Sequence, residues 1–191
     1  MDDLVEFDTL FEETLLSPVQ ATVFEKCVEI MQSQSASIVV IHMECFFVPY
    51  TKKANLDFVN FFNKLVDLQL RVYLLSWREE QEEDDTLARL GIDAGENTVM
   101  FYRDPGVRHK KSMGWYSDVA EYNQTRVLNS AGQPKNDPGK NIVMHIGQFW
   151  IDVFPYTAPE TALCSASTDT NIIFKHKDTE VYSVRLRSST F

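Results

Sequence analysis

Short apolar runs alternate along the chain with longer segments whose apolar residues recur at helical spacing. The apolar runs, rich in β-branched residues, predict strands at residues 38–41, 71–75, 98–102 and 142–146. The helical spacing predicts helices over residues 17–31, 55–69, 79–90 and 117–128. Ser17 and Pro18 form a typical helix start, and Gly91 a typical helix end. Strands that alternate with helices predict an α/β fold with a parallel sheet covered on both faces.

The pattern differs at both ends of the chain. The first 16 residues interleave acidic and apolar side chains, which is typical of an amphipathic arm on the domain or of a segment that docks on a partner. Beyond Pro155, two short strands at residues 171–174 and 180–187 predict an edge hairpin or a terminal extension. We therefore expect an arm (1–16), an α/β domain (17–156) and a C-terminal β extension (157–191) that packs on the domain or on a partner.

Composition narrows the class of protein. The chain has 191 residues, of which 44% are hydrophobic, enough for one well-buried core. A formal charge of −10 disfavours direct binding of nucleic acid. Three widely spaced cysteines, no secretory segment and no apolar run of membrane-spanning length predict an intracellular, cytoplasmic protein. The isolated histidines, His109, His145 and His176, do not have the spacing of metal ligands.

Ligands of open α/β sheets bind beyond the carboxyl ends of the strands. The candidate catalytic or binding residues are therefore expected after Ile41, after Leu75, in the helix from Ser117 and after Ile146. The side chains at these four places are, in order, His42 and Glu44, Ser76 and Arg78, Tyr122, and Gln148 and Asp152. A basic loop with Lys110 and Lys111 precedes the third place.

These places resemble the four catalytic motifs of the haloacid dehalogenase superfamily, nearest to its class B-like acid phosphatases. The resemblance covers residues 17–156 and is carried by Ser76-Trp77-Arg78 with residues 86–92, and by the strand 142–146 running into Gly147 and Asp152. In that family the motifs hold an Asp nucleophile with a second Asp two residues later, a Ser or Thr, a Lys, and acids that bind Mg²⁺. The resemblance implies a three-layer α/β/α sandwich, and the short segment 47–55 leaves no room for a large cap domain.

Several motif positions depart from the family pattern. The nucleophile, a small hydroxyl residue, the lysine and one metal-binding acid are replaced by His42, Phe46, Tyr122 and Gln148. The second hydroxyl position and the other metal-binding acid are kept as Ser76 and Asp152, and Glu44 stands at the acid/base position. One carboxylate with Glu44 supplies too little charge to hold Mg²⁺ tightly. We therefore expect no catalysis, no bound metal and no cofactor, with Mg²⁺ relevant only to an unexpectedly active site.

A domain without its catalytic groups acts through its surface. We expect a structural or protein-interaction component, for example of a larger assembly such as a viral particle. The candidate contact residues are aromatic: Phe7, Phe11, Phe46, Phe47, Tyr50 and Phe191. The segment 46–50 is either a docking patch or a plug that fills the vacated pocket.

Three alternatives stay open at the level of sequence. His42 could act as a phosphotransfer nucleophile, with Glu44 as acid/base and Asp152 orienting it. The site could instead bind an anion or nucleotide without catalysis, through Ser76, Arg78, Lys110 and Lys111. Finally, the chain could be an unrelated α/β domain, which a sheet without the first and last motifs on adjacent central strands would establish.

Overall fold

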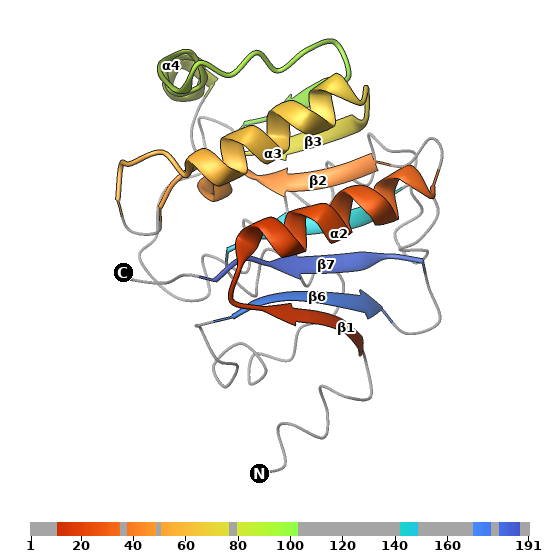
Figure 1. Ribbon diagram of the computed structural model, residues 1–191. Helices are drawn as coiled ribbons and strands as arrows, with labels where there is room; N and C mark the ends of the chain where they lie inside the picture. Colours follow the sequence, from red (N-terminus) through yellow and green to blue (C-terminus); the bar gives the residue numbers. More distant parts are fainter. Residues whose placement is uncertain are drawn as a thin grey trace, which may run out of the picture.

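The computed structural model describes residues 11–34, 38–48, 51–76, 80–102, 142–148, 170–176 and 180–187. Within these residues the strands form one seven-stranded sheet of order β1-β6-β7-β5-β2-β3-β4 (Figure 1). The strands are β1 (Phe11–Ser17), β2 (Ile38–His42), β3 (Arg71–Leu75), β4 (Thr98–Phe101), β5 (Ile142–Gly147), β6 (Asn171–His176) and β7 (Tyr182–Arg185). The helices are α2 (Gln20–Gln32), α3 (Leu56–Asp67), α4 (Glu80–Leu90) and the short 3₁₀ helix η1 (Met43–Phe46).

Most of the sheet is parallel. β7, β5, β2, β3 and β4 run in one direction, whereas β6 pairs antiparallel with β7 and β1 antiparallel with β6. β2 is central, and all five of its residues are buried, as a β-branched run in a covered parallel sheet should be. The predicted α/β class with a mainly parallel sheet is therefore confirmed.

Helices α2 and α3 lie side by side across one face of the sheet (Figure 1). Their contact includes the stacked rings of Phe24 and Phe61, whose centroids are 4.4 Å apart. Alternate strand residues such as Val39 and Ile41 join this core, because neighbouring residues of a strand point to opposite faces. The other face carries a second cluster of buried residues, which consists of Ile38, Val40, Tyr73, Leu75, Phe101 and Ile142.

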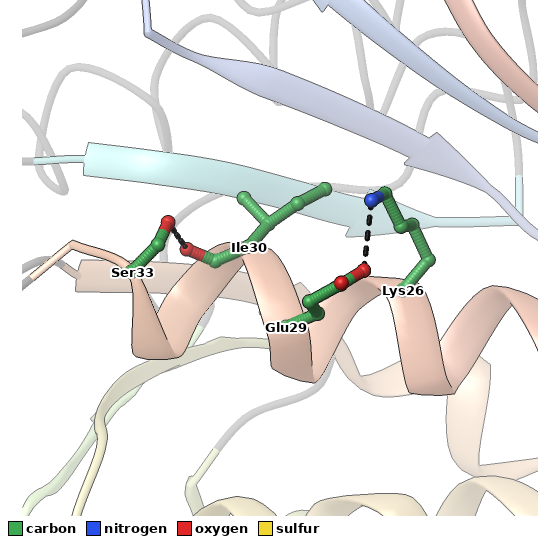
Figure 2. A network of polar contacts seen from close by, with 4 residues as sticks. All are labelled: Lys26, Glu29, Ile30 and Ser33. Carbon is green, nitrogen blue, oxygen red and sulfur yellow. Dashed lines mark hydrogen bonds and ion pairs between the residues drawn. The ribbon is translucent and has the colours of Figure 1, made fainter.

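Local contacts stabilise the helices, and hydrogen bonds or backbone conformation mark where they begin and end. In α2 the Lys26 ammonium pairs with the Glu29 carboxylate at 2.7 Å, and the Ser33 hydroxyl donates to the Ile30 carbonyl at 2.6 Å (Figure 2). Asn55 caps α3, since its side-chain oxygen accepts from the Phe58 amide at 3.3 Å. Gly91 follows α4 with a φ of +66°, the left-handed conformation that commonly ends helices.

The predicted start of the first helix at Ser17 is wrong. Ser17 is the last residue of β1, where it pairs with Asn171, and α2 begins at Gln20 after Val19. The Ser17 hydroxyl accepts from the Val19 amide at 3.1 Å, so it stabilises the turn between strand and helix. Ladder pairing with β6 therefore decided the conformation of a residue whose local sequence favours a helix cap.

Both chain ends contribute strands to the sheet. The described residues of the predicted N-terminal arm form most of β1, with Leu15 packed against the core. Residues 171–176 and 182–185 form the predicted antiparallel strand pair, but this pair is not at the edge of the sheet. β7 pairs in parallel with β5, and β1 covers the outer side of β6, so the expected edge position of the hairpin is corrected to an interior one.

The predicted helix over residues 117–128, the basic loop before it and the loop 129–140 lie outside the described residues. In the part of the chain that the structure describes, no helix has the length and apolar character required to cross a membrane.

Candidate functional site

Three of the four predicted positions meet at one edge of the sheet. β2 and β5 are parallel neighbours with Ile41 opposite Ile146, and His42 lies opposite Leu75 of β3 on the other side. The carboxyl ends of these strands bring His42, Ser76 and Gln148 to the same edge, as the rule for open α/β sheets predicts. The three residues are 2%, 0% and 4% exposed, so all three are shielded from solvent.

His42 is the last residue of β2 and η1 follows it directly. Its side chain alternates with Ile41 and therefore shares a face with Val40, on the side of the sheet opposite α2 and α3. Glu44 lies in the first turn of η1 and is partly exposed. The two residues at the nucleophile and acid/base positions thus differ in their access to solvent.

The Gln148 side chain connects the last motif position, at the end of β5, to the segment that follows the first motif position, at the end of β2. Its side-chain Nε2 donates to the carbonyl oxygen of Phe47 at 2.9 Å, across 101 residues of sequence. Close by, the Cys45 thiol lies 3.9 Å from the carbonyl oxygen of Ile146, a weak contact of the same kind. These contacts hold the carboxyl end of β5 against the segment that follows β2. A carboxylate at position 148 has no N–H with which to make this bond.

Phe46 belongs to the core. Its ring is fully buried and meets Phe58 and Phe62 of α3 edge-to-face, at centroid distances of 5.0 and 5.2 Å. The interpretation of Phe46 as part of a docking patch is therefore corrected, because a buried ring cannot meet a partner. Phe47 is partly buried against the same core, and Val48 is exposed.

Ser76 follows β3 and continues its pairing with β4. Its amide donates to the carbonyl oxygen of Phe101 at 2.8 Å, and the residue is completely buried. This amide is therefore committed to the sheet.

Sequence reasoning missed two arginines at this edge. Arg185 ends β7 opposite Gly147 of β5 and is only 2% exposed, while Arg187 is partly exposed two residues later. Arg185 Nη2 donates to the carbonyl oxygen of Thr170 at 3.0 Å. The available signal was a charged residue inside a short apolar strand, which indicates a buried cation only once that strand is known to be interior.

The remaining candidates lie outside the described residues: Phe7, Tyr50, Arg78, Lys110, Lys111, Tyr122, Asp152 and Phe191. Phe11 begins β1. Among the described residues no three His, Cys, Asp or Glu side chains are grouped as metal ligands would be.

No protein-family model matches this chain, and none of the curated proteins compared with it is similar in sequence. Fold and site together define the class: a mixed α/β protein with a mostly parallel sheet and a buried polar cluster at the carboxyl edge of its central strands.

Proposed function

We propose that this chain is a haloacid dehalogenase-like domain, a three-layer α/β/α sandwich, whose phosphatase site no longer catalyses and which serves as a structural or protein-interaction component. The sheet order supports the proposal. The strands that carry the first and last motif positions, β2 and β5, are adjacent, central and parallel. A sheet in which these two strands were not adjacent would have established that the resemblance is accidental.

The observation that carries the loss of catalysis is the hydrogen bond from Gln148 to the Phe47 carbonyl oxygen. In the related phosphatases an acid at this position faces Mg²⁺. Here the side chain is a neutral amide that donates to the backbone, so it stabilises the fold at the place where a metal ligand would be needed. An ionised carboxylate could not donate this bond, and it would place one of its oxygens against the Phe47 carbonyl oxygen.

The nucleophile position supports the same conclusion. The His42 imidazole replaces a carboxylate that would both attack phosphorus and bind the metal, and Mg²⁺ strongly prefers oxygen ligands. The side chain is also 2% exposed, which leaves little access for a substrate.

A domain of this kind acts through contacts on its surface, because its fold alone fixes no activity. The net charge of −10 favours protein partners over nucleic acid. We propose that these contacts are made in the cytoplasm, within a larger assembly such as a viral particle.

A phosphatase assay with an aryl phosphate tests the loss of catalysis. Purified full-length chain is compared with His42→Ala and Gln148→Ala, each with and without Mg²⁺. We expect no turnover above the level shared by all three proteins, and no rise in unfolding temperature with Mg²⁺. Metal-dependent turnover in the wild type that the His42→Ala change abolishes would overturn the proposal.

A further inference from the structure

The two outermost of the described strands differ in how they are protected against pairing with another chain. β1, at one edge of the sheet, carries Glu12 and Glu13 and has a shift of register between Glu13 and Leu15. Charges and bulges of this kind keep an edge strand from accepting a further strand. β4, at the other edge, contains no charged residue and no proline, and its pairing with β3 runs without a shift from Thr98 to Phe101. β4 is therefore the less protected edge.

The backbone of β4 presents two residues away from the sheet. The carbonyl oxygen of Asn97 accepts from the Val72 amide of β3 at 3.0 Å. Backbone groups alternate in direction along a strand, so those of Val99 also face β3, whereas those of Thr98 and Met100 face outward. Among the described strands, none pairs with this outer side. Thr98 and Met100 therefore offer backbone donors and acceptors to an added strand.

The side chains of β4 differ between the two faces of the sheet. Val99 is 36% exposed and shares a face with Tyr73, its partner on β3. On that face the Arg71 guanidinium lies 5.6 Å from the centre of the Tyr73 ring, so a cation is already present. Met100, on the opposite face, is partly buried against the core to which α4 contributes Leu87. An added strand would thus place alternate side chains beside Val99 and on the α4 side.

The chain around this edge is strongly acidic. Residues 80–102, from α4 to just beyond β4, contain seven acidic residues and a single basic one, Arg89. Asp85, Asp93 and Glu96 are exposed, the last two in the segment that leads into β4. Two copies of the chain joined through β4 would bring two such segments together, which like charge opposes. Charge therefore favours a cationic segment of another protein as the occupant.

We propose that the outer edge of β4 binds an extended, basic segment of a partner protein as a further strand of the sheet. Backbone hydrogen bonds to Thr98 and Met100 supply affinity, and alternate side chains supply specificity. Lysine or arginine side chains of the partner lie on the α4 side, and small apolar ones cover Val99. The four residues of β4 limit the contact to a short segment. The proposal rests on the protein-interaction role proposed above, but not on the loss of catalysis.

An eight-residue peptide in which lysine alternates with valine is the probe for this edge. Its binding to the full-length chain is measured by fluorescence anisotropy and by calorimetry. We expect saturable one-to-one binding that weakens as salt is added, because exposed charges contribute to it. Two control peptides should not bind: one of the same sequence with methylated backbone amides, which cannot donate to β4, and one with glutamate in place of lysine.

Substitutions at one position separate backbone pairing from side-chain contact. Thr98→Pro removes an outward N–H at the first residue of β4, where proline is compatible with a strand, and Thr98→Ala keeps that N–H. We expect Thr98→Pro to weaken peptide binding about tenfold and Thr98→Ala to leave it nearly unchanged. Glu96→Gln should weaken binding by up to about fivefold. Glu25→Gln, an equal change of charge at an exposed position of α2, should not.

The outcomes are decisive in either direction. Equal binding of the parent and methylated peptides, or equal affinity of Thr98→Pro and Thr98→Ala, would overturn strand addition at β4. The peptide comparison uses the wild-type chain, so it decides even where Thr98→Pro does not fold. No binding of the lysine–valine peptide, or equal binding of the glutamate peptide, would rule out a basic partner. Dimerisation that Thr98→Pro abolishes would assign the edge to a second copy instead. None of these results bears on the loss of catalysis, which the aryl phosphate assay tests separately.

Discussion

At the scale of single residues, the Gln148 side chain stabilises the fold through one buried hydrogen bond. Replacing it with Glu puts a carboxylate oxygen beside the Phe47 carbonyl oxygen that now accepts a bond at 2.9 Å, in a position only 4% exposed. We expect Gln148→Glu to lower the free energy of unfolding by about 2 kcal/mol or more near neutral pH, since a buried acceptor and a buried charge both go unsatisfied.

The effect of Gln148→Glu should depend on pH with a definite sign. A protonated carboxyl group can donate to the carbonyl oxygen, so the loss of stability relative to wild type should shrink as pH falls through the range where the buried carboxyl is protonated. Urea unfolding at several pH values measures this. Gln32→Glu, at an exposed position of α2, is the matched control. Equal, small effects of both changes at neutral pH would show that the Gln148 bond contributes nothing.

Cys27 gives a second prediction at this scale. Its thiol is completely buried in the core, and burial raises its pKa well above the usual range. Because the thiolate is the reactive form, we expect Cys27 to resist alkylation in the native protein at mildly alkaline pH and to react once denaturant is added. Mass spectrometry of the Cys27 peptide after labelling measures this; rapid native labelling would show that the core around α2 opens readily.

At the scale of elements, Asn55 links three segments. Its side chain caps α3 through the Phe58 amide, and its Nδ2 donates to Gln20 Oε1 at 3.2 Å and to the Cys45 carbonyl oxygen at 3.4 Å. We expect Asn55→Ala to cost about 1–2 kcal/mol of unfolding free energy, the upper part of the range for a helix cap. Chemical denaturation measures this against Asn60→Ala, at an exposed position within α3. An equal response of the two variants would contradict the structural role of Asn55.

The central strands could be predicted because their apolar residues suit the buried positions that they occupy. The run from Ile38 to Ile41 is apolar at every position, as a strand buried on both faces must be, and β2 spans it with one further residue. β1 could not be predicted from its own residues. Its acidic and apolar side chains suit an amphipathic arm equally well, and only pairing with β6, 150 or more residues away, makes it a strand. The same long-range pairing overrode the helix-start signal of Ser17.

The candidate site was predictable to the extent that topology brings strand ends together. His42, Ser76 and Gln148 meet because parallel strands end at one edge, which the alternation of strands and helices already implied. The position of Arg185 and Arg187 at this edge was not predictable, because it depends on which strand lies beside β5. Local sequence does not specify that neighbour, whereas the register of Gly147 with Arg185 does.

At the scale of the whole molecule, the C-terminal strands are part of the sheet. β7 lies between β5 and β6. Val184 of β7, Leu186 just after it and Ile173 of β6 are completely buried. Removing β6 and β7 would expose the backbone edge of β5 and leave β1 without a partner strand among those described. The polar edge would lose its arginines at the same time.

We therefore expect a chain truncated after residue 169 to lose cooperative unfolding and to aggregate, because it exposes an apolar core face and leaves β5 paired on one side only. Circular dichroism and thermal unfolding measure this. A chain that ends at Arg187 keeps all seven described strands and is the control. If the shorter chain unfolded cooperatively at a temperature near that of the control, β6 and β7 would be a separable extension, and the order of the sheet would not depend on them. If only the shorter chain lost cooperative unfolding, the sheet and the candidate site would instead form one folding unit that requires β6 and β7.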